Sequence, residues 1–150
     1  MRSKEHNYSA KAWYFVTTTT KHRLCYFGKV IKGRMVLNDY GYIAHEQWLW
    51  MSDYYDFVSV NKFVVMPNHV HAIIEIRVPY GTNAPRNLSQ LVSAYKTRVS
   101  SRIRNAGLPH FSWHRSFHDH IIRSPASYNT IAEYIHYNPM RWNDDRYFNT

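Results

Sequence analysis

The chain has 150 residues, of which 45% are hydrophobic and 17% aromatic, so it is long enough to bury one core and too apolar for a disordered protein. No apolar run is long enough to span a bilayer, the N-terminal residues lack the apolar core of a signal peptide, and a single Cys25 excludes an internal disulfide and a cysteine-rich zinc site. The sequence therefore predicts one domain over residues 1–150, located in the cytoplasm with the nucleoid and not in a membrane.

Positive charge is concentrated in two parts of the chain. The net charge is +9, the first 38 residues contain eight Lys or Arg and a single acid, Glu5, and no Asp or Glu lies between Arg77 and His118. A solvated basic surface explains this charge as well as a polyanionic partner does. The aromatic residues interleaved with the basic ones favour nucleic acid, because cations contact phosphates while aromatic rings stack on unpaired bases.

The first third of the chain is predicted to contain extended segments followed by a helix. Residues 12–20 (AWYFVTTTT) are rich in aromatic and β-branched residues, which is typical of a strand. Residues 24–37 form either a second extended pair or a loop. A helix then runs over residues 39–54, with Asn38 or Asp39 as its cap.

The next two strands carry the most informative pattern in the sequence. Residues 57–66 form one strand, residues 67–68 (Pro-Asn) turn the chain, and residues 69–78 form the next. Side chains alternate across a strand, so His69 and His71 share one face while an unbroken apolar set occupies the other. Two imidazoles held side by side could anchor a metal, although a histidine is often only a partly buried polar residue.

The second half of the chain is predicted to contain a loop, a helix and a strand. Residues 78–87 (VPYGTNAPRN) are rich in Pro, Gly and Asn and are expected to form a mobile surface loop. A helix then begins at Asn87 or Ser89 and ends near Asn105, with apolar residues at helical spacing. The segment 115–122 (RSFHDHII) is predicted to be another strand.

The last predicted element is a helix that begins at Ser124 and Pro125 and ends at Asn138, because the residue before a proline is disfavoured in helical geometry. The order of elements is typical of an α+β protein with a ferredoxin-like antiparallel sheet, helices on one face, and a C-terminal helix. We expect the strand of His69 to be an inner strand whose polar face lies beside or opposite this final helix.

One flank of the final helix brings a phenol and an amide together. Ile131 and Ile135 belong to its apolar stripe, and Tyr134 and Asn138 are four residues apart on the edge of that stripe. Two neutral imidazoles and one amide oxygen leave positions open on Mg²⁺ or Mn²⁺, which can then bind a phosphodiester. The phenol could attack phosphorus and form a covalent phosphotyrosine. A tyrosine that only packs on the helix surface is the alternative.

Four motifs resemble those of one protein family. His69-Val70-His71 is similar to the His-hydrophobe-His signature of the HUH endonuclease superfamily. The stretches VVMPNHVHAIIE, LSQLVSAYKTRVSSRI, WHRSFHDHIIR and EYIHYNP resemble, in the same order, the REP-associated tyrosine transposases, which are relatives of the single-tyrosine insertion-sequence transposases. The match covers residues 13–142.

This resemblance implies a metal-dependent endonuclease and strand transferase that acts on single-stranded DNA with hairpin structure, as a monomer or a homodimer, through a covalent 5′-phosphotyrosine. It implies Tyr134 as the nucleophile, His69 and His71 as catalytic metal ligands, and Asn138 as the third ligand of Mg²⁺ or Mn²⁺. The insertion-sequence branch usually carries Gln at the last position. A relative that binds DNA or RNA hairpins without cutting is the alternative function, and a replication initiator or relaxase is a third.

Several other residues are candidates for contacts with DNA. His118 and His120 form a second alternating pair, for which structural or DNA-contact roles are favoured over metal binding. Trp113 and Phe117 could stack on a base, although packing in the core is the favoured interpretation. The candidates for DNA binding are Lys96, Arg98, Arg102, Arg115, His120 and Arg123, with solvated surface charge as the alternative for the basic ones.

Overall fold

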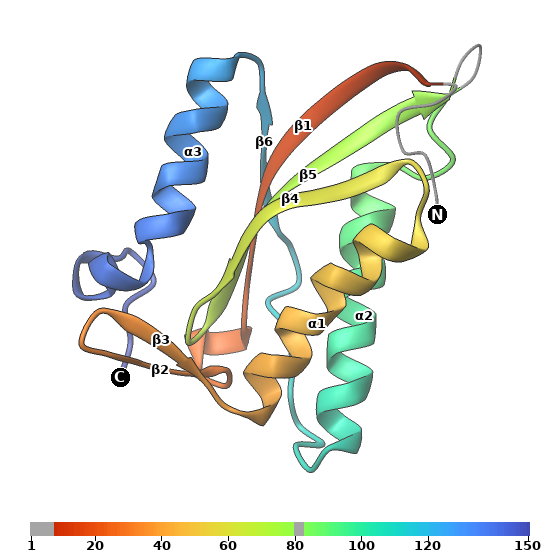
Figure 1. The fold of residues 1–150 in the computed structure, drawn as a ribbon. Helices are drawn as coiled ribbons and strands as arrows, with labels where there is room; N and C mark the ends of the chain where they lie inside the picture. Colours follow the sequence, from red (N-terminus) through yellow and green to blue (C-terminus); the bar gives the residue numbers. More distant parts are fainter. Residues whose placement is uncertain (1–7, 80–82) are drawn as a thin grey trace.

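The structure is a computed structural model that describes residues 8–79 and 83–150 of the chain. Part of the predicted loop over residues 78–87 therefore lies outside the described residues. Within the described residues, the strands of the main sheet pair antiparallel in the order β4-β5-β1-β6 (Figure 1). These strands are β1 (Tyr8–Thr19), β4 (Val58–Val65), β5 (His69–Pro79) and β6 (His118–Ile122). This order confirms the ferredoxin-like antiparallel sheet and places the histidine strand inside it.

Helices cover both faces of this sheet. The helices α1 (Asp39–Tyr54) and α2 (Leu88–Asn105) pack on one face, whereas α3 (Pro125–Tyr137) lies on the opposite one (Figure 1). Each helix begins at a side-chain cap that satisfies a free backbone N–H. These caps are Asn38, Asn87 and Ser124, whose side chains accept hydrogen bonds from the N–H groups of Gly41, Gln90 and Ser127.

The segment between β1 and α1 is a hairpin, which resolves the choice left open by the sequence. Strands β2 (Gly28–Ile31) and β3 (Arg34–Leu37) pair antiparallel beyond the short 3-10 helix η1 (Lys21–Arg23). Gly28 has a φ of +136°, and a Cβ there would lie 2.1 Å from the carbonyl oxygen of Val36, so only glycine fits. After α3 the chain continues into a second 3-10 helix, η2 (Pro139–Asp144).

The strand predicted over residues 115–122 begins later, at His118. His114 already donates its N–H to the carbonyl of Thr19, while the ladder between β6 and β1 starts where His118 pairs with Thr17. The four residue steps from His114 to His118 therefore span only the two steps from Thr19 to Thr17 on β1. The surplus residues leave the ladder, which shortens the strand.

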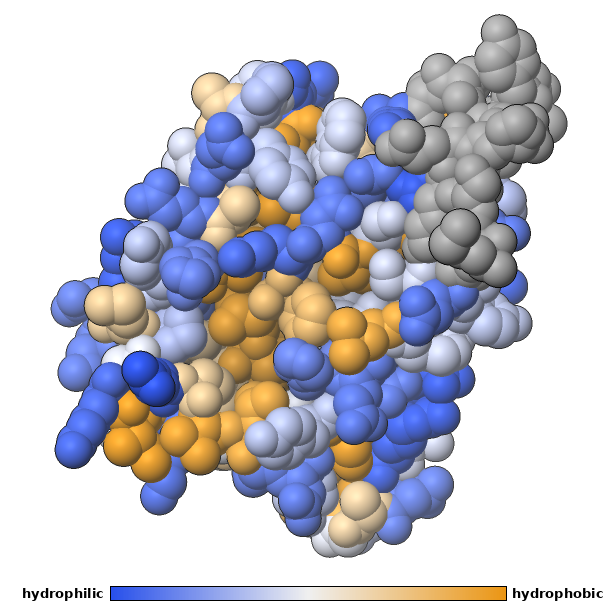
Figure 2. Space-filling model, in the orientation of Figure 1, coloured by the Kyte–Doolittle hydropathy of each residue, from blue (hydrophilic) through white to orange (hydrophobic). Residues whose placement is uncertain are grey.

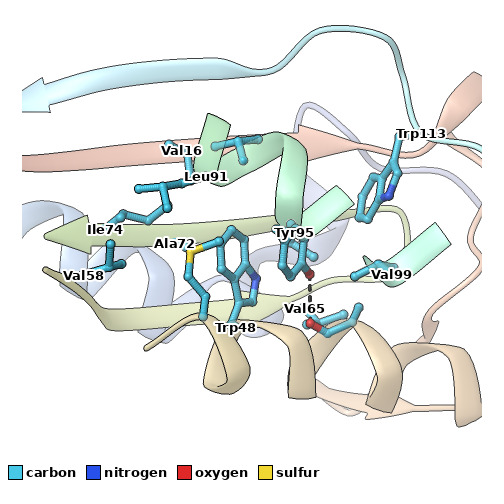
Figure 3. Packing of buried hydrophobic residues seen from close by; sticks show 14 of the residues in the cluster. Val16, Trp48, Val58, Val65, Ala72, Ile74, Leu91, Tyr95, Val99 and Trp113 are labelled. Atoms are coloured by element: carbon cyan, nitrogen blue, oxygen red, sulfur yellow. Dashed lines mark hydrogen bonds between the residues drawn. The ribbon is translucent and has the colours of Figure 1, made fainter. Parts of the chain in front are cut away.

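The main core lies between the sheet and the helices α1 and α2. Val70, Ala72 and Ile74 of β5 face this core, where Trp48 and Tyr95 stack with ring centroids 3.6 Å apart (Figure 3). The Tyr95 hydroxyl donates a hydrogen bond of 2.8 Å to the Ala44 carbonyl, so the phenol is buried without losing its polar partner. The predicted register of β5, which places its apolar residues on one face, is confirmed.

Polar side chains cover most of the side of the molecule seen in Figure 2, and apolar residues gather there between α3 and α1. Trp113 is 9% exposed and belongs to the main core, and Phe117 packs against that core. This confirms core packing as the role of Trp113. In the part of the chain that the structure describes, none of the helices is long and apolar enough to cross a membrane.

Candidate active site

The two histidines of β5 lie on the face of the sheet that α3 covers. Their ring centroids are 4.7 Å apart and their planes are inclined by 74°, and His69 is 0% and His71 2% exposed. The apolar residues on the other face of β5 fix its register, because a slip of one residue would move both imidazoles into the core. The strand therefore holds the rings as a buried, oriented pair.

The tautomer of His69 is set by Asn68. The Asn68 amide donates through Nδ2 to the carbonyls of Tyr147 and Arg23, at 2.7 and 3.1 Å. Its Oδ1 is thereby turned toward His69 Nδ1, at 2.9 Å. An amide oxygen only accepts hydrogen bonds, so Nδ1 of His69 carries the proton and Nε2 is left with a free lone pair.

His71 is oriented from the neighbouring strand. Thr17 of β1 pairs with His71 in the ladder, and its Oγ1 lies 2.7 Å from His71 Nδ1. A ring nitrogen held in this way leaves Nε2 to point into the site, as in metal-binding histidines that hydrogen-bond through their other nitrogen. Asn68 and Thr17 thus orient the imidazole pair.

Three buried polar atoms of this site, two imidazole nitrogens and one amide oxygen, lack a hydrogen-bond partner. They are Nε2 of His69, Nε2 of His71 and Oδ1 of Asn138, which follows the last residue of α3 and is 2% exposed. Unpaired buried polar groups are costly and uncommon, so such a cluster suits a cation. No three His, Cys, Asp or Glu side chains among the described residues are arranged as a metal site, so a cation here depends on the Asn138 amide. The residues present fit a divalent ion with mixed nitrogen and oxygen ligands.

The phenol of Tyr134 lies beside this cluster. Its ring centroid is 5.4 Å from that of His71 and 6.1 Å from that of Phe15. The ring of Phe15 lies on the sheet against His71. Burial raises the pKa of Tyr134, the Asp145 carboxylate raises it further, and a contact with Asn138 opposes the rise. The phenol is therefore protonated at neutral pH. The predicted nucleophile and the three predicted metal ligands lie together within one chain.

Burial also controls the charge of the two histidines. It lowers the pKa of His69 to about 3, a contact with the Asn138 side chain opposes this, and the Arg23 charge adds to it. Burial holds the pKa of His71 well below its usual range, and His69 lowers it further. Both imidazoles are neutral at pH 7, which is the form that binds a metal ion.

The segment after α3 completes the site with residues that sequence reasoning missed. Asp145 follows η2, its side chain is 2% exposed, and its Oδ2 lies 3.8 Å from His69 Nε2. Because this imidazole is neutral, two acceptor atoms face each other, and the carboxylate favours a cation between or beside them. The ring of Tyr147 covers His69 at 4.6 Å. No local pattern in the sequence marks either residue.

Comparisons with known proteins place the chain in a family. No protein-family model matches the chain. A protein of Haemophilus influenzae, itself named as uncharacterised, is 33% identical over 99% of this chain and 91% of its own length. The chain belongs to the same family as that protein.

Two solved structures share the fold. A REP-associated tyrosine transposase bound to a REP hairpin aligns with 94% of this chain and 74% of its own, with a TM-score of 0.62 and 20% identity. The chain has the fold of a REP-associated tyrosine transposase. A candidate transposase of Deinococcus radiodurans aligns with 91% of this chain and 96% of its own, with a TM-score of 0.58 and 17% identity. The fold implied by the resemblance of the motifs is confirmed.

Within this transposase fold, an open cleft of about 250 Å³ leads to the tyrosine. Its lining includes Tyr134 and His71 together with His118 and His120 of β6. Arg115 lies between two residues that line an adjoining cleft, and Arg123 lines a separate one at the start of α3. His120 and Arg123 therefore lie on the same face of the sheet as Tyr134, whereas the backbone carbonyl of Arg115 accepts a hydrogen bond from Lys96 of α2 at 3.5 Å. Contacts of these three residues with DNA stay predictions.

The predicted basic residues of α2 lie elsewhere. This helix packs on the face opposite to His69 and His71. Lys96 donates to the carbonyl of His114 at 2.7 Å, Arg98 donates to Gln47 and stacks on Trp50 at 3.8 Å, and Arg102 is exposed. None of these contacts involves Tyr134 or the two histidines, and contacts of Lys96, Arg98 and Arg102 with DNA stay predictions.

Proposed function

We propose that the chain is a metal-dependent endonuclease and strand transferase, of HUH type, for single-stranded DNA that contains a hairpin. The observation that carries this proposal is the cluster of unpaired buried polar atoms on His69, His71 and Asn138 beside the phenol of Tyr134. The fold shared with a REP-associated tyrosine transposase bound to a REP hairpin supports the class of DNA.

The ligands that would hold the ion are His69 Nε2, His71 Nε2 and Asn138 Oδ1. When bound there, Mg²⁺ or Mn²⁺ would supply polarisation of a phosphodiester and neutralise its charge. Asn68 and Thr17 bind Nδ1 of the two imidazoles, so that Nε2 of each ring is directed into the site. The buried carboxylate of Asp145 adds negative charge next to them, which favours the cation further.

The covalent step would use Tyr134 of the same chain, since its ring lies against His71. The Tyr134 hydroxyl oxygen attacks phosphorus and loses its proton, and a new phosphorus–oxygen bond forms. The bond from phosphorus to the 3′ oxygen breaks, and that oxygen takes up a proton and leaves as a 3′-hydroxyl. The strand beyond the break is then held as a 5′-phosphotyrosine. Attack by a 3′-hydroxyl reverses the step, so joining requires no ATP.

The test is a covalent adduct. Wild-type protein, a DNA hairpin with single-stranded flanks and Mn²⁺ should give a protein–DNA band that survives denaturing electrophoresis. Tyr134→Phe should abolish the band and leave DNA binding unchanged, because the substitution removes only the nucleophilic oxygen. Tyr137→Phe, on the same helix but exposed, is the matched control and should retain the band.

Two results would count against this proposal. A band that persists in Tyr134→Phe would move the nucleophile to another residue. Salt-sensitive binding of hairpins without any adduct in Mg²⁺ or Mn²⁺ would favour the hairpin-binding alternative.

A further inference from the structure

A second cleft lies on the same face of the sheet as the histidines, between the N-terminal end of α3 and the strands. Its volume is about 390 Å³, within the range of ligand pockets. Its lining combines two aromatic rings, an aliphatic side chain, two amides and a guanidinium, which belong to Trp13, Tyr128, Ile122, Asn61, Asn129 and Arg123.

The indole of Trp13 is held rigidly in this cleft. Its Nε1–H donates to Oε1 of Glu75 at 3.2 Å, and the same oxygen accepts from Asn61 Nδ2 at 3.2 Å. Arg77 donates to the other oxygen of Glu75, so the carboxylate is itself fixed. The aromatic wall therefore has its position before any ligand enters, which lowers the entropy lost on binding.

The cleft adjoins the candidate active site along β1. Trp13, Phe15 and Thr17 point to one face of this strand, since side chains alternate. Phe15 stacks on His71 at 5.3 Å and meets Tyr134 at 6.1 Å. Trp13 is two residues further along the strand, a step of roughly 7 Å. A DNA strand with its phosphodiester at Tyr134 can therefore reach this cleft with a nearby nucleotide.

We propose that this cleft binds the base of an unpaired nucleotide close to the scissile phosphodiester. The inference rests on the proposed function and adds a site for a base to it. Trp13 and Tyr128 offer aromatic surface for stacking, which every nucleobase can use. The amides of Asn61 and Asn129 offer donors and acceptors to the edge of a flipped base, and Arg123 offers a cation to its phosphate.

The experiment measures binding without cleavage, in the Tyr134→Phe background. A DNA hairpin is selected by its binding to this protein from a pool with randomised single-stranded flanks. The selected hairpin is then synthesised with one abasic nucleotide at each flank position in turn. One position should lose about tenfold in affinity when its base is missing, since stacking of one base accounts for a change of this order.

A double-mutant cycle then assigns that base to the cleft. Tyr128→Ala should weaken binding of the intact hairpin about tenfold and of the matching abasic hairpin hardly at all. Asn129→Ala, an exposed substitution that leaves the fold intact, should relax the base preference at that position alone. Tyr42→Ala is the control and removes a 56% exposed tyrosine on α1, across the sheet. Its effect on the binding free energy should be the same for the intact hairpin and for every abasic hairpin.

The outcomes separate this inference from the proposed enzyme. If no abasic position couples to Tyr128 or Asn129 while wild-type protein forms the adduct, the base site is overturned and the enzyme stands. If one position couples but no adduct forms with wild-type protein, the base site stands and the covalent chemistry is wrong. A melting temperature for each variant shows whether lost binding comes from lost structure.

Discussion

The two faces of β5 differ in character, although the side chains of both come from one strand of eleven residues. The face toward α1 and α2 is apolar, and its side chains, such as Ala72 and Ile74, are buried in the main core. The face toward α3 buries His69, His71 and Arg77 to within 2% of complete burial. The first face contributes hydrophobic stabilisation. On the second, the unpaired acceptors each cost about 1–3 kcal/mol until a ligand satisfies them.

This contrast shows how one strand serves folding and chemistry together. A polar cluster with unsatisfied atoms would lower stability if it also had to organise the core. Here the apolar face fixes the register, and the register delivers the imidazoles to their places. Substitutions on the two faces should therefore have separable effects on stability and on metal binding.

The largest effect on stability is expected on the core face. Ile74→Ala removes a side chain that is 0% exposed and should lower the free energy of unfolding by about 2–5 kcal/mol, because the cavity closes only in part. Urea denaturation measures this, and the folded fraction should bind Mn²⁺ as wild type does. Val36→Ala, on an exposed position of β3, should change stability by less than about 0.5 kcal/mol. A small loss for Ile74→Ala would contradict the division between the faces.

The largest effect on metal binding is expected on the opposite face. His71→Ala removes a proposed ligand and should lower the affinity for Mn²⁺ at least about a hundredfold, since even the partners of ligands are worth 10- to 100-fold. Isothermal titration calorimetry measures the change. His136→Ala, an exposed histidine on α3, should bind Mn²⁺ like wild type. Equal affinities for the two variants would remove His71 from the site.

Asn68 should act through His69 and not as a ligand. Asn68→Ala leaves Nδ1 of His69 without its acceptor, so either ring nitrogen can carry the proton, and the affinity for Mn²⁺ should fall about 10- to 100-fold. Asn68→Asp keeps an acceptor for Nδ1 but loses the two bonds donated to the carbonyls of Arg23 and Tyr147, so it should recover only part of the affinity. The ¹⁵N shifts of His69 report the tautomer directly. An unchanged Nδ1–H tautomer in Asn68→Ala would refute this role.

The most gradual effect, spread over several pH units, is expected in the pH dependence of stability without metal. The folded state holds the pKa of His69 at about 3, while the unfolded chain has its usual value near 6.5. Below that value the unfolded state binds more protons, so stability is lost as pH falls from about 6.5 toward 3, by up to about 1.4 kcal/mol per pH unit for each such histidine. The slope from urea denaturation should be shallower in His71→Ala, which removes the second one. Identical slopes would show that His71 is not held neutral.

Local patterns were sufficient to predict most of the fold. The alternation over residues 69–78 fixed which side chains face the core, and the caps at Asn38, Asn87 and Ser124 marked where helices begin. The four-residue spacing of Tyr134 and Asn138 placed them on one flank of α3. These features depend on neighbours in sequence, and such neighbours are visible without a structure.

Contacts between distant segments could not be predicted in this way. Asn68 is marked by the sequence only as a turn residue, yet it is 0% exposed and bonds residues 45 and 79 positions away. Asp145 and Tyr147 reach the histidines because η2 turns the chain back over β5. The basic residues of α2 share a charge pattern with those near β6, and only the packing of α2 shows that they lie across the sheet.

The hydrogen bonds of Asn68 also bear on the stage of folding at which the histidine site becomes able to bind an ion. Its amide joins the strand turn to the carbonyls of Arg23 and Tyr147, so Asn68 orients His69 only when the segments of Arg23 and Tyr147 have both docked. A nascent or partly folded copy would hold the imidazoles without directing them. If the site holds an ion, its uptake would follow the docking of these two segments.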